Sequence, residues 1–365
     1  MFNNFYKNRR VLVTGHTGFK GSWLTLWLLE LGAKVAGFSL YLPSKPCNFE
    51  ILGLDKHVAH YVGDIRDYDA LRGVFEAFEP EIIFHLAAQP IVRRSYDEPK
   101  LTFDTNVGGT VNVLECVRQS SSVKASVVIT SDKCYKNVEW VWGYRENDQM
   151  GSYDPYGASK GSAEIAINSY CQSFFRGEET KRVASARAGN VIGGGDWGQD
   201  RLIPDCVNAW SKGREVIIRN PHATRPWQFV LEPLSGYLWL GVLLGNNKLK
   251  SGEAFNFGPK SDVVQPVNIL IDTCKKYWDE AQWKVIADSS FKRESGLLKL
   301  CCDKALSMLN WKAALSFEET VEFVALWYKE FYQNGENMLE FSTQQIEQYY
   351  SLARDRGVQW AKNDK

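Results

Sequence analysis

The side chains at positions 156 and 160 have the types and spacing needed to remove a proton from a hydroxyl group. Residues four apart lie on one face of a helix, so Tyr156 and Lys160 would be neighbours. A tyrosine has a pKa of about 10, and a nearby cation lowers that pKa by stabilising the phenolate. The pair therefore predicts a tyrosine that acts as a base, although a solvated helix face would show the same spacing.

A second reactive group, Ser131-Asp132-Lys133, follows the apolar run 126–130. Such a short run predicts a buried strand, and ligands of open α/β sheets bind beyond the carboxyl ends of the strands. A hydroxyl, a carboxylate and an amine would then lie beside the reactive centre. They supply one acid and one base more than a simple dehydrogenase needs, although an exposed turn would contain the same residue types.

Glycines 15, 18 and 21 lie between the apolar run 11–14 and the amphipathic segment 22–31. This order predicts a strand, a tight turn and a helix. Glycines let backbone N–H groups approach a pyrophosphate, and the N-terminus of the helix attracts the anion. We therefore expect a dinucleotide to bind at Gly15, Gly18 and Gly21.

The acidic residue that usually binds the ribose of the dinucleotide, about 20 residues after such a turn, is missing. The second apolar run, 34–39, ends in Gly37-Phe38-Ser39, which leaves the choice between NAD and NADP open. Asp64 follows the third run, 60–62, and is expected to bind the adenine amine. An Asp at this position can equally cap a helix.

Apolar runs alternate with helical patterns through the first half of the chain, which predicts a doubly wound parallel α/β sheet, the Rossmann arrangement. The expected strands span residues 11–14, 34–39, 60–62, 82–86, 126–130 and 183–186. We place this dinucleotide-binding domain at 1–188. Residues 189–365 are expected to form mainly a smaller mixed α/β lobe that binds substrate. Residues of about 230–258, with a helix at 233–244 and a strand at 254–257, are expected to return to the large sheet.

The 365 residues carry 43 basic and 43 acidic side chains, so no bulk charge would draw the chain to nucleic acid or to an anionic membrane. The longest apolar stretch, 237–244, is far shorter than the roughly 20 residues that span a bilayer, and residues 1–10 lack the apolar core of a secretory signal. We therefore expect a cytoplasmic protein. The eight cysteines form no CxxC pair, which predicts neither a metal site nor a disulfide framework.

Four segments, 14–21, 85–89, 106–110 and 156–160, resemble the extended short-chain dehydrogenase/reductase family, and the likeness covers essentially the whole chain. The resemblance implies the following cofactor-binding residues: Gly15, Thr17, Gly18, Phe19, Gly21, Asp64, Ile65, Leu86, Ala87, Ala88, Asn106, Tyr156 and Lys160.

Within that family, segments 130–135 and 187–196 resemble the nucleotide-sugar 4,6-dehydratases that act on CDP-glucose. Related dehydratases for dTDP-glucose and GDP-mannose typically carry Glu where this chain has Lys133. The resemblance implies an NAD-dependent lyase that converts a CDP-linked hexose to its 4-keto-6-deoxy form, with the hydride removed from C4 returning to C6. Enzymes of this kind commonly serve the synthesis of deoxysugars in bacterial O-antigens.

The same resemblance assigns roles to the reactive side chains. Tyr156 would take the proton of the C4 hydroxyl, Lys160 would bind the nicotinamide ribose, and Ser131 would hydrogen-bond the C4 oxygen. Asp132 would protonate the departing C6 hydroxyl. Lys133 would remove the C5 proton if it is neutral when needed, because burial and nearby cations can lower the pKa of a lysine.

Substrate contacts are expected from Gln89, Asn190, Arg201 and Arg225. Guanidinium groups bind a pyrophosphate in a forked, bidentate manner. For both arginines the alternative is surface pairing with local acids such as Asp196 and Asp200. The sequence does not indicate which residues distinguish cytosine.

Two other functions compete with dehydration. A nucleotide-sugar 4-epimerase uses the same Tyr156 and Lys160 but needs no acid and base to remove water, so Asp132 and Lys133 argue against it. A non-catalytic dinucleotide sensor would keep the glycine turn without needing the tyrosine–lysine pair. The resemblance also implies a homodimer that packs through helices near 106–118 and 156–174. Whether two such dimers form a tetramer is left open by the sequence.

Overall fold

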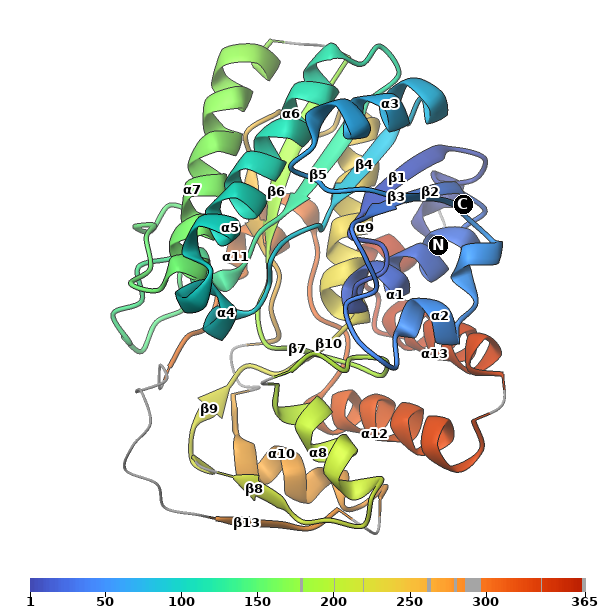
Figure 1. Cartoon of the computed structure of the whole chain (residues 1–365), viewed down its shortest axis with the longest axis vertical. Helices are drawn as coiled ribbons and strands as arrows, with labels where there is room; N and C mark the ends of the chain where they lie inside the picture. The colour runs from blue at the N-terminus through green and yellow to red at the C-terminus, as the bar shows by residue number, and fades with distance from the viewer. Residues whose placement is uncertain are drawn as a thin grey trace.

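A computed structural model of the protein describes residues 1–177, 180–199, 201–218, 220–260, 264–278, 281–285, 297–335 and 337–362. A seven-stranded sheet with helices on both faces lies above a smaller lobe (Figure 1). The strand order is β11-β6-β5-β4-β1-β2-β3, and all neighbouring strands run parallel. The strands are β1 Arg10–Thr14, β2 Lys34–Ser39, β3 Ala59–Val62, β4 Ile82–His85, β5 Ala125–Ile129, β6 Arg182–Arg187 and β11 Ala254–Asn256.

Every strand predicted in the first half of the chain is present, with each end within one residue of the expected position. The central strands were recognisable because both of their faces are buried, which produces a continuous apolar run. β4 and β5, for example, are buried along their whole length. The predicted doubly wound parallel sheet is therefore confirmed.

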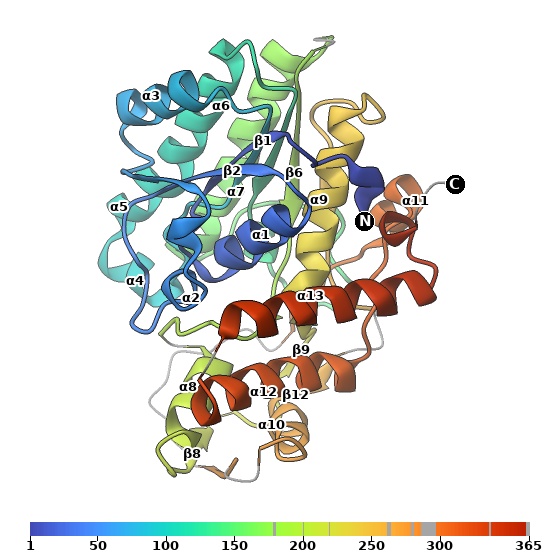
Figure 2. The ribbon, with the colours of Figure 1, turned by 90° about the vertical axis from the view of Figure 1, so that its right-hand side faces the viewer.

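Alternate residues of β1 pack into different cores, as the two-residue period of a strand requires. Val11 and Val13 belong to the core that also contains side chains of α1 (Phe19–Glu30) and α9 (Leu231–Gly245). Leu12 belongs to the core on the opposite face. That face is covered by the helices α3 Tyr68–Phe78, α6 Gly109–Gln119 and α7 Pro155–Tyr170 (Figure 2).

The chain returns to the large sheet after residue 230. In α9, residues 231–244 are all buried, as expected for a helix that is apolar on every side. β11 then pairs with β6, with Phe255 opposite Ala186 and Asn256 opposite Arg187. The division of the chain near residue 188 stays a prediction.

The smaller lobe is built from short strands and helices below the carboxyl edge of the sheet (Figure 1). Three two-stranded sheets pair β7 with β10, β9 with β12 and β8 with β13. These strands are β7 Val191–Ile192, β8 Val216–Ile218, β9 Thr224–Arg225, β10 Gln228–Phe229, β12 Gln265–Pro266 and β13 Trp283–Val285. Its helices are α8 Leu202–Trp210, α10 Val267–Cys274 and α12 Phe317–Gln333.

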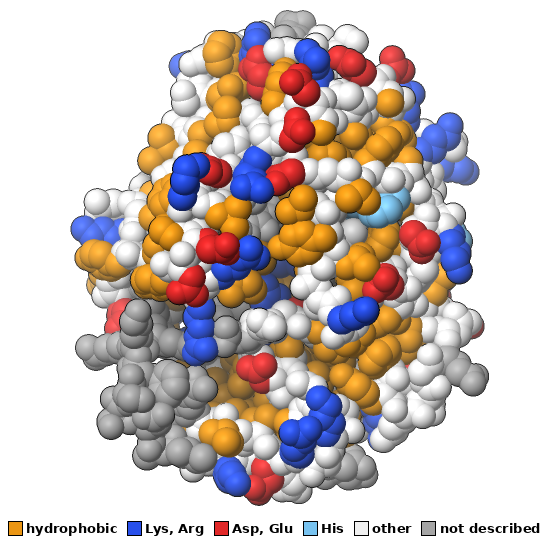
Figure 3. All heavy atoms as spheres, in the orientation of Figure 1, with side chains coloured by type: hydrophobic (Ala, Val, Ile, Leu, Met, Phe, Trp, Pro, Cys, Tyr) orange, Lys and Arg blue, Asp and Glu red, His pale blue; other side chains and the backbone are white. Residues whose placement is uncertain are grey.

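The remaining helices lie around the large sheet. α13 (Met338–Asp355) packs beside α1 (Figure 2). The shorter ones are α2 Asn48–Ile51, α4 Val92–Asp97, α5 Pro99–Phe103 and α11 Asp303–Leu309. None of the helices within the described ranges combines the length and hydropathy that a bilayer span requires. Acidic and basic side chains are interspersed over the face drawn in Figure 3, in keeping with the equal numbers of the two charges.

A buried carboxylate joins the start of α9 to the C-terminal part of the chain. Glu232 accepts hydrogen bonds from the backbone N–H groups of Ala314 at 2.9 Å and Leu315 at 2.6 Å. The hydroxyl of Tyr349 on α13 donates to it at 2.8 Å. Burial raises the pKa of Glu232 from 4.5 to about 6, even though these donors act in the opposite direction.

This raised pKa predicts a pH dependence of stability. The folded state holds the Glu232 proton more tightly than the unfolded state, so the stabilisation is complete below pH 4.5 and is lost as the pH rises through about 6. Glu232→Gln should reduce the fall in unfolding free energy between pH 5 and pH 7 by about 1 kcal/mol. Urea unfolding at the two pH values measures it, and the exposed Glu347→Gln serves as control. An unchanged fall in the Glu232 variant would contradict the assignment.

Candidate active site

The carboxyl ends of four neighbouring strands lead into the predicted functional segments. The glycine turn follows β1, residues 86–89 follow β4, residues 130–133 follow β5, and residues 188–190 follow β6. Because these strands are parallel and adjacent, all four segments lie along one edge of the sheet. The strand order reverses between β1 and β4, which is where such sheets bind ligands.

The turn between β1 and α1 leaves no room for a side chain at two of its glycines. Gly15 has a φ of +76°, and a Cβ there would lie 2.7 Å from the backbone N of Ala87. A Cβ on Gly21 would lie 2.1 Å from the carbonyl oxygen of Gly15. Gly18 is the N-cap of α1, which begins at Phe19. This geometry fits the pyrophosphate of a dinucleotide, which needs close backbone approach at a helix N-terminus.

His16, in the turn between β1 and α1, packs its ring against the carboxyl end of β2. His16 is fully buried, and a Cβ on Gly37 would lie 2.2 Å from its ring. Its Nδ1 is 2.8 Å from the hydroxyl of Ser39, and its Nε2 is 2.7 Å from Nδ1 of His60. Burial, with His60 as a second cause, lowers the pKa of His16 to about 3. The position where a ribose-binding acid often lies is therefore filled by a neutral imidazole bonded to Ser39.

Asp64 is not the N-cap of the following helix, which was the alternative to its role in binding adenine. Asp67 is the N-cap of α3, and its carboxylate accepts from the backbone N–H of Ala70 at 3.0 Å. Asp64 instead forms a two-point ion pair with Arg66. Arg66, through this hydrogen bond, lowers the pKa of Asp64. Asp64 also lines an open cavity beside the N-terminal part of α6, so its predicted role in binding adenine remains a prediction that fits this position.

The side-chain amides of Gln89 and Asn106 form hydrogen bonds with other residues of the protein. Asn106 accepts from the backbone N–H of Gln89 at 2.8 Å and donates to the hydroxyl of Ser159 at 2.9 Å. Gln89 accepts from the backbone N–H of Ile91 at 2.6 Å and donates to Thr102 at 2.9 Å. These bonds attach the segment after β4 to α7. Contacts of the two residues with ligands stay predictions.

α7 presents Tyr156 and Lys160 to the reactive centre. Asp154 caps the helix by accepting from the backbone N–H of Gly157 at 2.8 Å, and Pro155 occupies its first position. Tyr156 is therefore in the first turn, and Ser131 lies near enough to its hydroxyl to act on its pKa. The predicted helical spacing of Tyr156 and Lys160 is confirmed.

The prediction that the pKa of Tyr156 is lowered from its usual value is wrong for this structure. Burial raises the pKa of Tyr156 to about 12, and the nearby Ser131 only partly offsets that effect. Lys160 is itself buried, which lowers its pKa to about 8 against the opposing charge of Glu164. Removal of both groups from water outweighs their spacing on the helix.

Ser131 and Asp132 lie together, with Gly189 behind the carboxylate. The hydroxyl of Ser131 donates to Asp132 Oδ1 at 2.9 Å and accepts from the backbone N–H of Lys133 at 3.2 Å. A Cβ on Gly189 would lie 1.8 Å from Asp132 Oδ2, so only glycine leaves room for the acid. Asp132 also lines a cavity together with Asn190.

The two predicted phosphate-binding arginines differ in position. Arg201 forms an ion pair with Asp196, the acid that we gave as its alternative partner, at 2.8 Å, but the pair is not at the surface because the Asp196 side chain is only 7% exposed. The charge of Arg201 acts on Tyr156, so it also lies near the reactive centre. Arg225 is on β9, directly before Pro226, which lines the same cavity as Asp132 and Asn190. Substrate contacts of both arginines stay predictions.

Several residues of this region were missed by the sequence analysis. Lys20, the lysine of the glycine turn, is near enough to Asp132 and Arg201 for their charges to act on it, and burial lowers its pKa to about 8. A lysine inside a turn otherwise explained by backbone geometry was the available signal. Lys260 and Lys299 line the cavity with Asp132 but come from loops without a recognisable motif. Among the described residues, no cluster of His, Cys, Asp and Glu could hold a metal ion.

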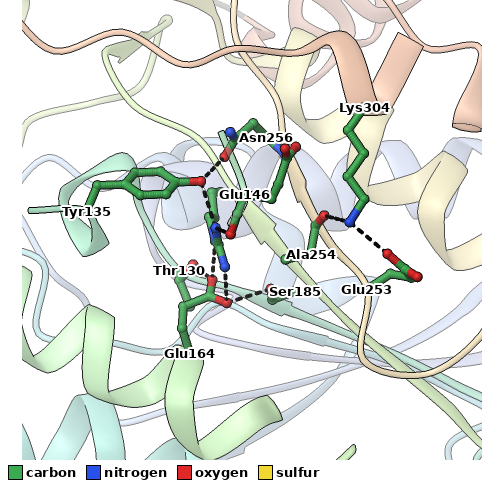
Figure 4. A network of polar contacts seen from close by, with 10 residues as sticks. Thr130, Tyr135, Glu146, Glu164, Ser185, Glu253, Ala254, Asn256 and Lys304 are labelled. Atoms are coloured by element: carbon green, nitrogen blue, oxygen red, sulfur yellow. Dashed lines mark hydrogen bonds and ion pairs between the residues drawn. The ribbon is translucent and has the colours of Figure 1, made fainter. Parts of the chain in front are cut away.

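A buried ionic network surrounds Glu164, which lies one helical turn after Lys160 on α7 (Figure 4). The carboxylate of Glu164 on α7 accepts two hydrogen bonds from Arg187 on β6, at 2.9 and 2.8 Å. Thr130 and Ser185 also donate to Glu164. Arg187 donates further to the hydroxyl of Tyr135 at 2.7 Å. The network thereby fixes the end of β5, which carries Ser131 and Asp132, against the helix that carries Tyr156 and Lys160.

Comparison with known proteins places this site in a family. The family model described as GDP-mannose 4,6 dehydratase matches residues 12–324. A CDP-glucose 4,6-dehydratase of Salmonella typhimurium is 48% identical over 353 residues, which cover 95% of this chain and 98% of the relative.

Solved structures show the same fold. The epimerase Mth375 of Methanothermobacter thermautotrophicus has a TM-score of 0.78 at 24% identity, with 91% of this chain and 95% of that chain covered. The dTDP-glucose 4,6-dehydratase of Bacillus anthracis, solved in complex with NAD, has a TM-score of 0.72 at 21% identity, with 88% and 97% covered. The chain therefore belongs to the GDP-mannose 4,6-dehydratase family of short-chain dehydrogenases/reductases that modify nucleotide sugars.

Proposed function

We propose that the protein is an NAD-dependent CDP-glucose 4,6-dehydratase, a hydro-lyase that forms CDP-4-keto-6-deoxy-D-glucose and water. The observation that carries this proposal is the 48% identity with a CDP-glucose 4,6-dehydratase over almost the full length of both chains. The buried group of Ser131, Asp132 and Tyr156 supplies side chains for oxidation and for removal of water.

The glycine turn and the N-terminus of α1 fit the pyrophosphate of NAD, with Gly15, Gly18 and Gly21 allowing close approach. Asp64 and Ile65 would hold the adenine, and Lys160 the nicotinamide ribose. When bound, NAD supplies the acceptor for the C4 hydride and the donor that returns it to C6. The further contacts that we propose come from Thr17, Phe19, Leu86, Ala87, Ala88 and Asn106.

The residues of the chain move the protons. Tyr156 removes the proton of the C4 hydroxyl while Ser131 holds the C4 oxygen. The resulting ketone makes the C5 proton acidic, and Lys133 removes it. Asp132 then protonates the C6 hydroxyl, which leaves as water. Because Asp132 lies beside Ser131 and against Gly189, its carboxyl group is held next to the tyrosine that begins the reaction.

Replacing Asp132 with asparagine should separate the two halves of the reaction. C4 oxidation should continue, because Tyr156 and Ser131 remain, whereas loss of an acid group slows elimination by about 10²- to 10⁴-fold. Absorbance of the reduced cofactor should therefore accumulate in the enzyme. Asp69→Asn, at a side chain that is 80% exposed, is the control. Equal loss of oxidation and elimination with substrate still bound would mean that Asp132 has another role.

The proposed substrate is tested by incubating the purified protein with NAD⁺ and CDP-, dTDP-, UDP- or GDP-linked hexoses. Loss of one water, found by mass spectrometry only with CDP-glucose, is the expected result. Interconversion of glucose and galactose forms without water loss would instead establish the epimerase function. Neither reaction, with NAD still bound, would favour a dinucleotide sensor.

We also propose that two copies of the chain form a homodimer through α6 and α7. Ile165 on α7 is 65% exposed and Phe174, just after this helix, is 51% exposed, whereas Ile167 is buried against the sheet. Large apolar side chains that face outward from this one helical segment favour a protein partner. Sedimentation equilibrium should give twice the mass of the chain, and the mass of one chain would rule out this dimer.

A further inference from the structure

The amide of Gln228 has a fixed orientation beside the catalytic acid. Gln228 lies on β10, at the junction between the large sheet and the smaller lobe (Figure 1), and is 1% exposed. Its Nε2 donates to the carbonyl oxygens of Gly189 at 2.8 Å and Phe257 at 3.1 Å. A carbonyl oxygen only accepts, so the NH₂ group must face both of them. Oε1 therefore points away from these two carbonyl groups.

This Oε1 atom is buried and has no hydrogen-bond partner among the described residues. A buried acceptor without a partner carries a desolvation penalty of about 1–3 kcal/mol, and most such groups in folded proteins are paired. An unpaired Oε1 is not sufficient evidence of a site, because Gln345 on α13 has one as well. The difference is that Gln228 lines the cavity that Asp132 also lines.

Gly189 brings Asp132 and Gln228 to the same place. The carboxylate of Asp132 packs against Gly189 where a Cβ would be, 1.8 Å from Oδ2. The carbonyl group of the same Gly189 accepts from the amide of Gln228. A ligand group held by both side chains would have to accept a hydrogen bond from the acid and donate one to Oε1. A hydroxyl does both, whereas a keto oxygen only accepts.

We propose that Oε1 of Gln228 accepts a hydrogen bond from the C6 hydroxyl of the hexose and so holds the leaving group for Asp132. This inference rests on the proposed dehydratase function, in which Asp132 protonates that hydroxyl. It assigns to Gln228 a direct contact with substrate that the resemblance to known families did not provide.

The elimination balances without any additional reactant. Lys133, acting as the neutral amine, takes the C5 proton, the electron pair of the C5–H bond forms the C5–C6 double bond, and the C6–O bond breaks. Asp132 gives its proton to the departing oxygen, which leaves as water with its original hydrogen still donated to Gln228. Gln228 itself neither gains nor loses a proton.

A purely structural role for Gln228 must be distinguished, since its amide also holds the backbone at Gly189 and Phe257. We would therefore compare CDP-glucose with its 6-deoxy-6-fluoro analogue. Fluorine at C6 can accept a hydrogen bond from Asp132 and leave as fluoride, but it cannot donate to Oε1. The ratio of the two elimination rates, measured within each variant, cancels any general loss of structure or of C4 oxidation.

Gln228→Met should lower this ratio of hydroxyl to fluoro elimination by about tenfold, the effect of one lost hydrogen bond of about 1.4 kcal/mol. Gln345→Met is the control, because it also removes a buried amide, one that donates to the carbonyl of Phe323 at 2.8 Å. Gln345 does not line the cavity that contains Asp132, so this variant should leave the ratio unchanged.

An unchanged ratio in Gln228→Met would overturn the inference, as would an equal loss of ratio in Gln345→Met. These outcomes are separate from failure of the proposed function. If the wild-type protein removes no water from CDP-glucose, the dehydratase proposal fails first. If wild type removes water and the ratio is insensitive to Gln228, only the contact with the C6 hydroxyl is refuted.

Discussion

Replacing Tyr156 with phenylalanine is expected to lower kcat for CDP-glucose by about 10²- to 10⁴-fold, the usual contribution of a general base. Phenylalanine keeps the ring in the first turn of α7 but removes the hydroxyl, whose pKa is influenced by the nearby Ser131. C4 oxidation is the first chemical step, so no reduced cofactor should accumulate. Rapid-mixing absorbance of NADH, together with steady-state product formation, measures both effects.

Tyr153→Phe is a suitable control for Tyr156→Phe. Tyr153 is only three residues earlier and is 87% exposed, so its hydroxyl can be removed without changing the buried centre. Its kcat should remain within about twofold of wild type, since exposed substitutions change stability by only about 0.5 kcal/mol. If the two variants lose activity equally, or if Tyr156→Phe still oxidises C4 at the normal rate, the base has been misassigned.

Replacing Glu164 with glutamine is expected to lower the free energy of unfolding by about 3–5 kcal/mol, the typical cost of leaving one buried charge without its partner. Glutamine nearly preserves the shape of the side chain. It leaves the guanidinium of Arg187, whose side chain is only 2% exposed, without a compensating charge. Chemical unfolding in urea at neutral pH measures the difference.

Glu98→Gln is the matched control, because Glu98 pairs with Arg94 at the surface and its side chain is 45% exposed. Exposed ion pairs contribute only about 0–1 kcal/mol, so this variant should unfold almost as wild type does. A loss of less than 1 kcal/mol in Glu164→Gln would show that water or other groups compensate Arg187. The network in Figure 4 would then not be what fixes the end of β5 against α7.

Local sequence information predicted the framework of the site. The strands of the first half were identified because short apolar runs between helical patterns leave few other structures. The glycine turn was recognised from its glycines between an apolar run and an amphipathic segment, and the structure shows that two of them, Gly15 and Gly21, have no room for a Cβ. The helical spacing of Tyr156 and Lys160 follows directly from the four-residue separation.

Contacts between distant segments were not predictable in the same way. Glu164 and Arg187 are 23 residues apart on α7 and β6, and neither residue type indicates its partner. Gln228 was not among the residues predicted to bind substrate, because its importance depends on a carbonyl 39 residues away, that of Gly189. Lys20 was missed because the turn that contains it was interpreted through its glycines alone.

The sequence determined the order of strands and helices, the glycine turn and the identity of the reactive side chains, since these depend on residue type and on spacing along the chain. Only the tertiary structure decided their electrostatic state. Tyr156 has a pKa raised to about 12 and Lys160 a pKa lowered to about 8 because surrounding segments remove both from water. Burial depends on packing among residues far apart in the sequence, and no local spacing encodes it.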